Sequence, residues 1–159
     1  MSTSTHLSSR VPSGTNALVL LIGALLTPVA TGLSLQLLPM GPPVLIYALV
    51  AGFFAFRHPE QNWQWGLWTA GGMLVALMVV LLIGGSFMWW TGNNVDPGAG
   101  WGIVKVTLVF GFAPALAGGC LGGIGGSLLA RQSYKQFVVV LAVLTAVLIA
   151  MAVFTYVGG

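Results

Sequence analysis

The stretch GFAPALAGGCLGGIGGSLLARQSYK, from Gly111 to Lys135, carries six glycines between Gly118 and Gly126 inside an otherwise apolar run. In the interior of a helix in water, glycine costs about 1 kcal/mol relative to alanine. A lipid bilayer changes this balance, because every backbone N–H and C=O there must bond within the segment, which favours a helix even for glycine. The stretch therefore predicts a membrane helix built for close contact with another helix.

The composition of the whole chain also indicates a membrane protein. Its 159 residues are 57% hydrophobic and 4% charged, with a mean hydropathy of +0.99, whereas a soluble domain carries about 25% charged residues. Five basic and two acidic side chains cannot cover the surface of a soluble domain of this length. The sequence therefore predicts an all-α integral membrane protein. The cations form no basic stripe, so we expect no nucleic-acid partner.

Five apolar runs follow a Ser/Thr-rich N-terminal segment. We expect residues 1–16 to form a disordered cytoplasmic tail and residues 17–159 to form the transmembrane domain. A bilayer core requires about 20 helical residues, and the spans are expected at about 17–38, 42–57, 66–88, 104–130 and 137–157. The second run covers only about 22 Å as a helix, so a re-entrant segment is the alternative. The predicted fold is a bundle of about five transmembrane helices, or four if the first run is a cleaved signal.

The positions of the cations predict the orientation of the chain. With five spans, one side of the membrane receives four cations, namely Arg10, Arg57, Arg131 and Lys135. Lys105 lies near the other side, where it either extends toward the surface or contacts an anion. Because positively charged loops mark the cytoplasmic side, we expect the N-terminus in the cytoplasm and the C-terminus outside. The expected location is a bacterial plasma (inner) membrane.

The glycine-rich run presents two neighbouring lines of small residues on a helical wheel. One line holds Gly111, Ala115, Gly119, Gly123 and Ser127, and the other holds Gly118, Gly122 and Gly126. Small residues allow helix backbones to approach closely in lipid, where hiding apolar groups gains little. We expect this face to pack within the bundle on Gly71, Gly72, Gly84 or Gly85, or on a helix of another chain. Pro114 is expected to kink the run. The pattern G-x-x-x-x-G-K-[ST] is missing, which argues against a phosphate-binding loop.

The sequence offers little chemistry for catalysis. Glu60 and His58 are near neighbours, but Asp96 is expected across the membrane from them, so the two carboxylates cannot pair. No Cys/His group has the spacing of a metal site. Nothing near Cys120 in the sequence would stabilise a thiolate. We therefore predict no catalytic, cofactor-binding or metal-binding residues, and a chain that is not an enzyme.

Two polar features remain as candidates for a functional role. The first is a set of residues that act either as an interfacial anchor or as a cytoplasmic docking rim: Arg57, His58, Glu60, Trp63 and Trp65. The second is a row of hydroxyls on the first run, formed by Thr27, Thr31 and Ser34. These hydroxyls either bond to the preceding helical turn or line a path for a neutral solute.

Two classes of function are consistent with these features. The preferred class is a non-catalytic accessory or assembly component, which packs through its glycine-rich fourth helix on a membrane-protein partner or on further copies of itself. The alternative is a small oligomeric channel or carrier for a neutral solute. Ion-coupled transporters usually place an ionisable residue at the bilayer midplane, and this sequence has none there. Five helices with short loops also leave little room for a pore within one chain.

Overall fold

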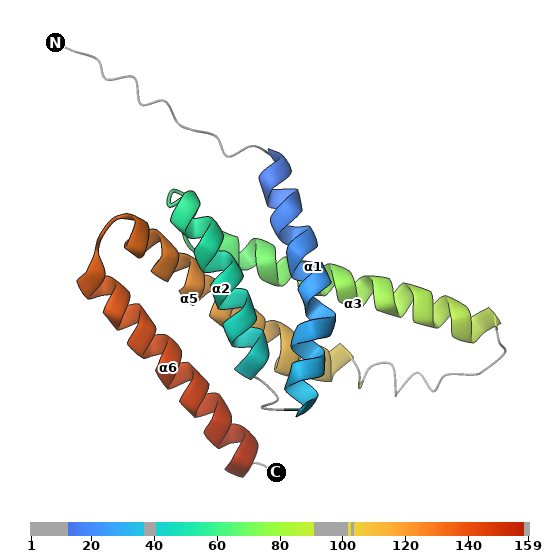
Figure 1. The fold of residues 1–159 in the computed structure, drawn as a ribbon. Helices are drawn as coiled ribbons and strands as arrows, with labels where there is room; N and C mark the ends of the chain where they lie inside the picture. Colours follow the sequence, from blue (N-terminus) through green and yellow to red (C-terminus); the bar gives the residue numbers. More distant parts are fainter. Residues whose placement is uncertain (1–12, 37–40, 91–101, 103, 158–159) are drawn as a thin grey trace.

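The computed structural model of the chain describes residues 13–36, 41–90, 102 and 104–157. Its elements are α1 (Ser13–Gln36), α2 (Gly41–Arg57), α3 (Gln64–Trp90), the π-helical turn η1 (Thr107–Phe112), α5 (Ala113–Ala130) and α6 (Tyr134–Val157) (Figure 1). Four helical segments are long and apolar enough to cross a membrane, and α2 is a shorter apolar helix. The chain is therefore an all-α membrane protein of the predicted fold class.

The first helix begins earlier than the sequence pattern predicts. α1 includes Ser13 to Asn16, which were expected in the tail, and residues 1–12 lie outside the described residues. Serine is a favoured residue at a helix start because its hydroxyl can accept from a free backbone N–H. The polar residues that follow occupy the first turn. Apolar periodicity alone misses such a turn, because it detects only the hydrophobic part of a helix.

The pair formed by α2 and α5 has the most extensive contact in the bundle. Val44 of α2 lies beside Gly118 of α5, and Gly52 lies beside Gly126. The two helices therefore run parallel, with α3 as the intervening antiparallel element. Parallel packing over this length makes α2, although short, a full structural partner of the glycine-rich helix.

The other helices surround this pair unequally. Gly66, near the start of α3, lies beside Gly119, while Met73 lies beside Gly111, so α3 is antiparallel to α5. Figure 1 shows that the second half of α3 extends past α1, and that α6 lies on the outer side of the α2–α5 pair. Among the described residues, the buried ones accordingly belong to α1, α2, η1, α5 and the first half of α3.

The helix changes type just before Pro114. In η1 (Thr107–Phe112) the turns are π-helical, and the N–H of Ala113 bonds to the carbonyl of Leu108, five residues earlier. Proline has no N–H, and its ring would clash with the carbonyl four residues before it, which belongs to Phe110. A π-helical turn widens the helix and removes this clash. The structure thus places a wide turn where the sequence led us to expect a kink.

A tight turn ends α5 and directs the chain into α6. The N–H of Ser133 donates to the carbonyl of Leu128 at 2.9 Å, and the N–H of Gln132 donates to that of Leu129 at 3.1 Å. Gln132 has a φ of 57°. This is the bond pattern of a Schellman motif, in which glycine usually occupies the left-handed position. A glutamine there carries the steric cost that glycine avoids.

Gln132→Gly is expected to stabilise the protein by about 1 kcal/mol, because the left-handed conformation penalises a residue with a Cβ by about that amount. Thermal unfolding in a mild detergent, followed by circular dichroism, measures the effect. Gln136→Gly is the matched control, since Gln136 lies in the first turn of α6, where glycine lowers helix stability. A Gln132→Gly protein that is no more stable than the wild type would contradict the steric account of this turn.

Candidate functional site

Three glycines of α5 lie one turn apart against three carbonyl groups of α2. The pairs are Gly118 with Val44, Gly122 with Ala48, and Gly126 with Gly52. A Cβ added to any of these three glycines would overlap the facing carbonyl oxygen. Such contacts gain dispersion energy and allow Cα–H···O interactions between helices in lipid. The α2–α5 contact therefore requires glycine at each of these positions of α5.

The second line of small residues faces α3 and the loop before it. A Cβ on Gly119 would lie 3.0 Å from the Cα of Gly66, and one on Gly123 would overlap the carbonyl of Asn62. Ser127 is buried, and its hydroxyl donates to the carbonyl of Ile124 at 2.8 Å. The predicted packing face thus lies against helices of its own chain.

The remaining two members of the predicted face lie nearer the start of the segment. Ala115 is fully buried in a cluster with Tyr47 and Met73. A Cβ on Gly111 would overlap the end of the Met73 side chain. Because a methionine side chain is flexible, a substitution at Gly111 is easier to accommodate than one against a backbone carbonyl.

The expected contact of α5 with the glycine pairs of α3 is wrong in detail. Gly72 faces α1, where its Cβ would overlap Leu20 and Gly23, and nothing lies within 4 Å of a Cβ at Gly71 or Gly84. Gly85 lies outside the described contacts. Gly66 is the glycine of α3 that meets α5, because the second half of α3 passes beyond α1 and away from α5.

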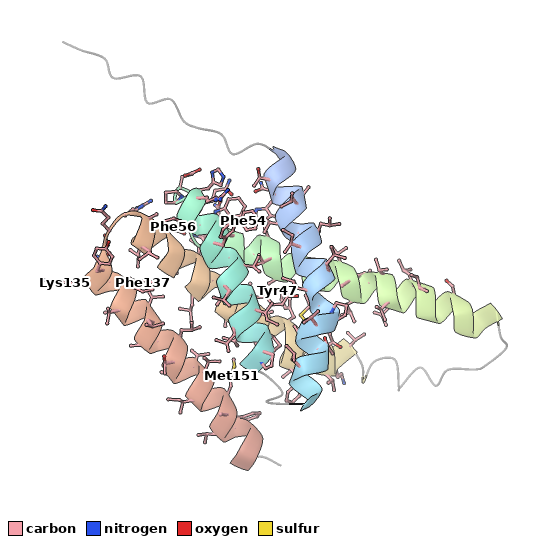
Figure 2. The ribbon with its side chains drawn as sticks, in the orientation of Figure 1. Tyr47, Phe54, Phe56, Lys135, Phe137 and Met151 are labelled. Carbon is pink, nitrogen blue, oxygen red and sulfur yellow. The ribbon has the colours of Figure 1, made fainter. Side chains whose placement is uncertain are left out.

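The hydroxyls of α1 bond to the protein itself. Thr27 donates to the carbonyl of Gly23 at 3.0 Å, and Thr31 donates to the carbonyl of Thr27 at 2.8 Å. The hydroxyl of Tyr47 lies 3.0 Å from that of Thr27 and donates to the Gly23 carbonyl at 2.9 Å. Figure 2 shows Tyr47 at the contact of α2 with α1. The bonds of Thr27 and Thr31 match the first role considered for the hydroxyls of α1, which is bonding to the preceding helical turn. The side chain of Ser34 lies outside the described residues.

Sequence reasoning did not select Tyr47, although the sequence does contain a signal. A phenol in the middle of an apolar run needs a hydrogen-bond partner when it is buried, and Tyr47 is 1% exposed. Thr27 lies at a similar depth on the preceding antiparallel run. Thr27 lies nine residues before the end of α1 and Tyr47 lies six residues after the start of α2. The sequence therefore indicates a polar contact between the two runs, but it does not fix which residues pair.

The residues of the predicted docking rim have different surroundings. Trp65 is 0% exposed, and its indole N–H donates to the carbonyl of His58 at 3.1 Å, so it belongs to the core and cannot meet a partner. Trp63 is exposed. The guanidinium of Arg57 lies 4.9 Å from the centre of the Phe53 ring. Nδ1 of His58 lies 3.6 Å from Oε1 of Glu60.

Cations gather at the end of the bundle where α2 ends and α6 begins. Arg131 donates from Nη2 to the carbonyl of Pro59 at 3.1 Å, which connects the end of α5 to the loop that follows Arg57. Lys135 lies in the first turn of α6, at the same end as Phe54 and Phe56 of α2 (Figure 2). Lys105 is near the start of the segment Val104–Ala130, at its opposite end. Arg10 lies outside the described residues.

No group of three or more His, Cys, Asp or Glu side chains within the described ranges is placed to hold a metal ion. Cys120 is a half-buried free thiol on α5, and Asp96 lies outside these ranges. Comparison with known protein families, curated protein sequences and solved structures finds no match to this chain.

Proposed function

We propose that the chain is a non-catalytic accessory or assembly component of a complex in a bacterial inner membrane, with its N-terminus in the cytoplasm. Arg57, Arg131 and Lys135 lie at one end of the bundle, and the positive-inside rule assigns that end to the cytoplasm. The glycine-rich helix then has an internal role: it holds α2 and the start of α3 at close range. A partner must therefore bind another surface of the chain.

The second half of α3 carries this proposal. α1 and α5 pack on the first half, where Trp65, Thr69, Ala70 and Met73 are buried. Beyond Met73, none of the described side chains of α3 is buried, and the exposed large apolar side chains include Met78, Val80, Leu82 and Ile83. The part of α3 beyond Met73 ends at Trp90 and is about 25 Å long at 1.5 Å per residue, enough for several turns of contact with a helix of another protein.

The alternative function, a small channel or carrier for a neutral solute, receives less support. The hydroxyls of Thr27 and Thr31 bond within the protein. A solute path along α1 would compete with these bonds. The geometry therefore favours a role in helix–helix assembly.

The proposal is tested by purification from native membranes together with site-specific photo-crosslinking. A benzophenone amino acid at Ile83 of α3 probes the proposed surface. The same amino acid at Leu49 of α2 is the control, because both side chains are strongly exposed, at 67% and 74%. We expect co-purification with a stoichiometric membrane-protein partner that crosslinks from position 83 and not from position 49. A monomer or a homo-oligomer that yields no such adduct would exclude the accessory role.

A further inference from the structure

The basic end of the bundle has an excess of positive charge that its own carboxylates do not balance. Glu60, the acid at this end, lies 3.6 Å from Nδ1 of His58. Within the described part of the chain, Arg57, Arg131 and Lys135 have no carboxylate within 4.0 Å. All three cations are exposed. Arg57 is the last residue of α2, Arg131 directly follows α5, and Lys135 lies in the first turn of α6, so the fold brings the end of α2 to the turn between α5 and α6.

Two of these cations are held in place by the protein. Arg131 uses one N–H of its guanidinium to bond the carbonyl of Pro59. Arg57 lies over the ring of Phe53. A guanidinium has five N–H donors, so the bond to Pro59 leaves donors on Arg131 for an anion. Fixing the group in advance lowers the entropy lost when an anion binds.

A surface hollow lies at the turn between α5 and α6. It is lined by Gln132, Ser133, Tyr134, Lys135 and Gln136. The hydroxyl of Ser133, the side-chain amides and the ammonium of Lys135 are all groups that donate hydrogen bonds to phosphate oxygens. The Schellman bonds of Ser133 and Gln132 fix the backbone of this turn. The hollow therefore combines a positive charge and neutral donors on a defined backbone.

The depth of the hollow in the membrane identifies its ligand. The spans that flank it end at Ala130 and begin at Tyr134, so the turn lies at the level of the lipid headgroups. Tyr134 and Trp63 are exposed at this end, as expected for aromatic residues at a membrane interface. A phospholipid phosphate is permanently present at that level at high local concentration. Basic groups at the ends of membrane helices bind anionic headgroups.

We propose that the basic end binds the headgroup of an anionic phospholipid from the adjacent leaflet. Lys135 and the donors of the hollow contact its phosphate, and Arg131, which precedes Gln132 in the chain, adds a second positive charge at this end of the bundle. The lipid is thereby held against the α5–α6 turn. This binding does not depend on a partner at the second half of α3, and the two proposals can fail separately.

Native mass spectrometry of the full-length protein in a neutral detergent tests the proposal. The purified protein is titrated with phosphatidylglycerol and, separately, with phosphatidylcholine of the same acyl chains. We expect the wild type to retain phosphatidylglycerol about 25-fold more tightly than phosphatidylcholine, and the removal of Lys135 or Arg131 to cost about fivefold each in the affinity for phosphatidylglycerol. The variants are Lys135→Gln and Lys135→Gln with Arg131→Gln, and Lys105→Gln at the opposite end is the charge-matched control.

The outcomes separate the binding of a lipid from the binding of a free anion and from a loss of folding. A loss of preference in Lys135→Gln, with an unchanged circular dichroism spectrum and an unaffected Lys105→Gln protein, supports the site. Lys135 is an exposed side chain in the first turn of α6, so this variant is expected to fold. Equal retention of the two lipids by the wild type would overturn the proposal. Displacement of phosphatidylglycerol by inorganic phosphate at equal concentration would also overturn it, because the ligand would then be the free ion.

Discussion

Gly122→Ala is expected to lower the free energy of unfolding by about 3 kcal/mol, at the upper end of the range for overpacked cores. The added Cβ would overlap the carbonyl oxygen, carbonyl carbon and Cα of Ala48. These are backbone atoms of a helix, so they cannot move aside as a flexible side chain can. The α2–α5 contact would have to separate along its length, and with it would go the Cα–H···O contacts and dispersion energy that join the pair.

Gly84→Ala provides the matched control for this prediction. It adds the same methyl group to another membrane helix, at a position where nothing lies within 4 Å of the new Cβ. We expect it to leave stability unchanged or to raise it by up to about 1 kcal/mol, because alanine is the better helix former. Thermal unfolding of both variants in one detergent, followed by circular dichroism, gives the comparison. Equal stabilities would show that α2 does not pack on Gly122.

The same substitution separates two uses of the glycine-rich face. If the face met a different protein, Gly122→Ala would fold normally and would lose that protein on purification. If it holds α2 in place, the variant loses folding stability before any partner is considered. The contacts of Gly118, Gly122 and Gly126 with α2 predict the second result, and Gly118→Ala and Gly126→Ala should behave in the same way.

The sequence predicted the membrane class and the small-residue character of α5 because both are local properties. It did not predict which helix fills the glycine face. The third run was the expected partner within the chain because of its glycine pairs, and only the three-dimensional course of α3 excludes Gly71, Gly72 and Gly84 from this contact. A usable signal was present in the second run, where Ala48 and Gly52 are spaced by four residues. That spacing matches Gly122 and Gly126, and it would have identified α2 as a candidate partner.

The tryptophans show a second limit of sequence reasoning. Trp63 and Trp65 both lie just before an apolar run, where interfacial tryptophans are common. The structure exposes Trp63 and buries Trp65 completely. The difference depends on the rotation of the start of α3, which is set by its contacts with α1, α2 and α5. A pattern that reports only depth in the membrane cannot distinguish a residue facing the headgroups from one facing the core.

Trp65→Ala is expected to destabilise the protein by about 4 kcal/mol, as is usual when a large buried aromatic side chain is removed. Trp65 lies in a buried cluster with Val19 of α1 and Ala51 and Ala55 of α2. Its ring centre is 5.5 Å from that of Phe54. One side chain thus joins three helices, and its removal would leave a cavity at their meeting point. Circular dichroism is the suitable probe of unfolding, because the mutation removes a fluorophore.

Two further variants identify the source of this loss. Trp63→Ala deletes the same side chain two residues away, at a position that is 46% exposed, and should change stability by about 0.5 kcal/mol or less. Trp65→Phe keeps an aromatic ring but removes the N–H that donates to the carbonyl of His58, and should cost about 1 to 2 kcal/mol for the lost hydrogen bond and the smaller ring. Similar losses in Trp65→Ala and Trp63→Ala would place Trp65 at the membrane interface, where the sequence pattern alone puts it. A loss in Trp65→Ala well above that in Trp65→Phe would instead establish packing as the main contribution of this residue.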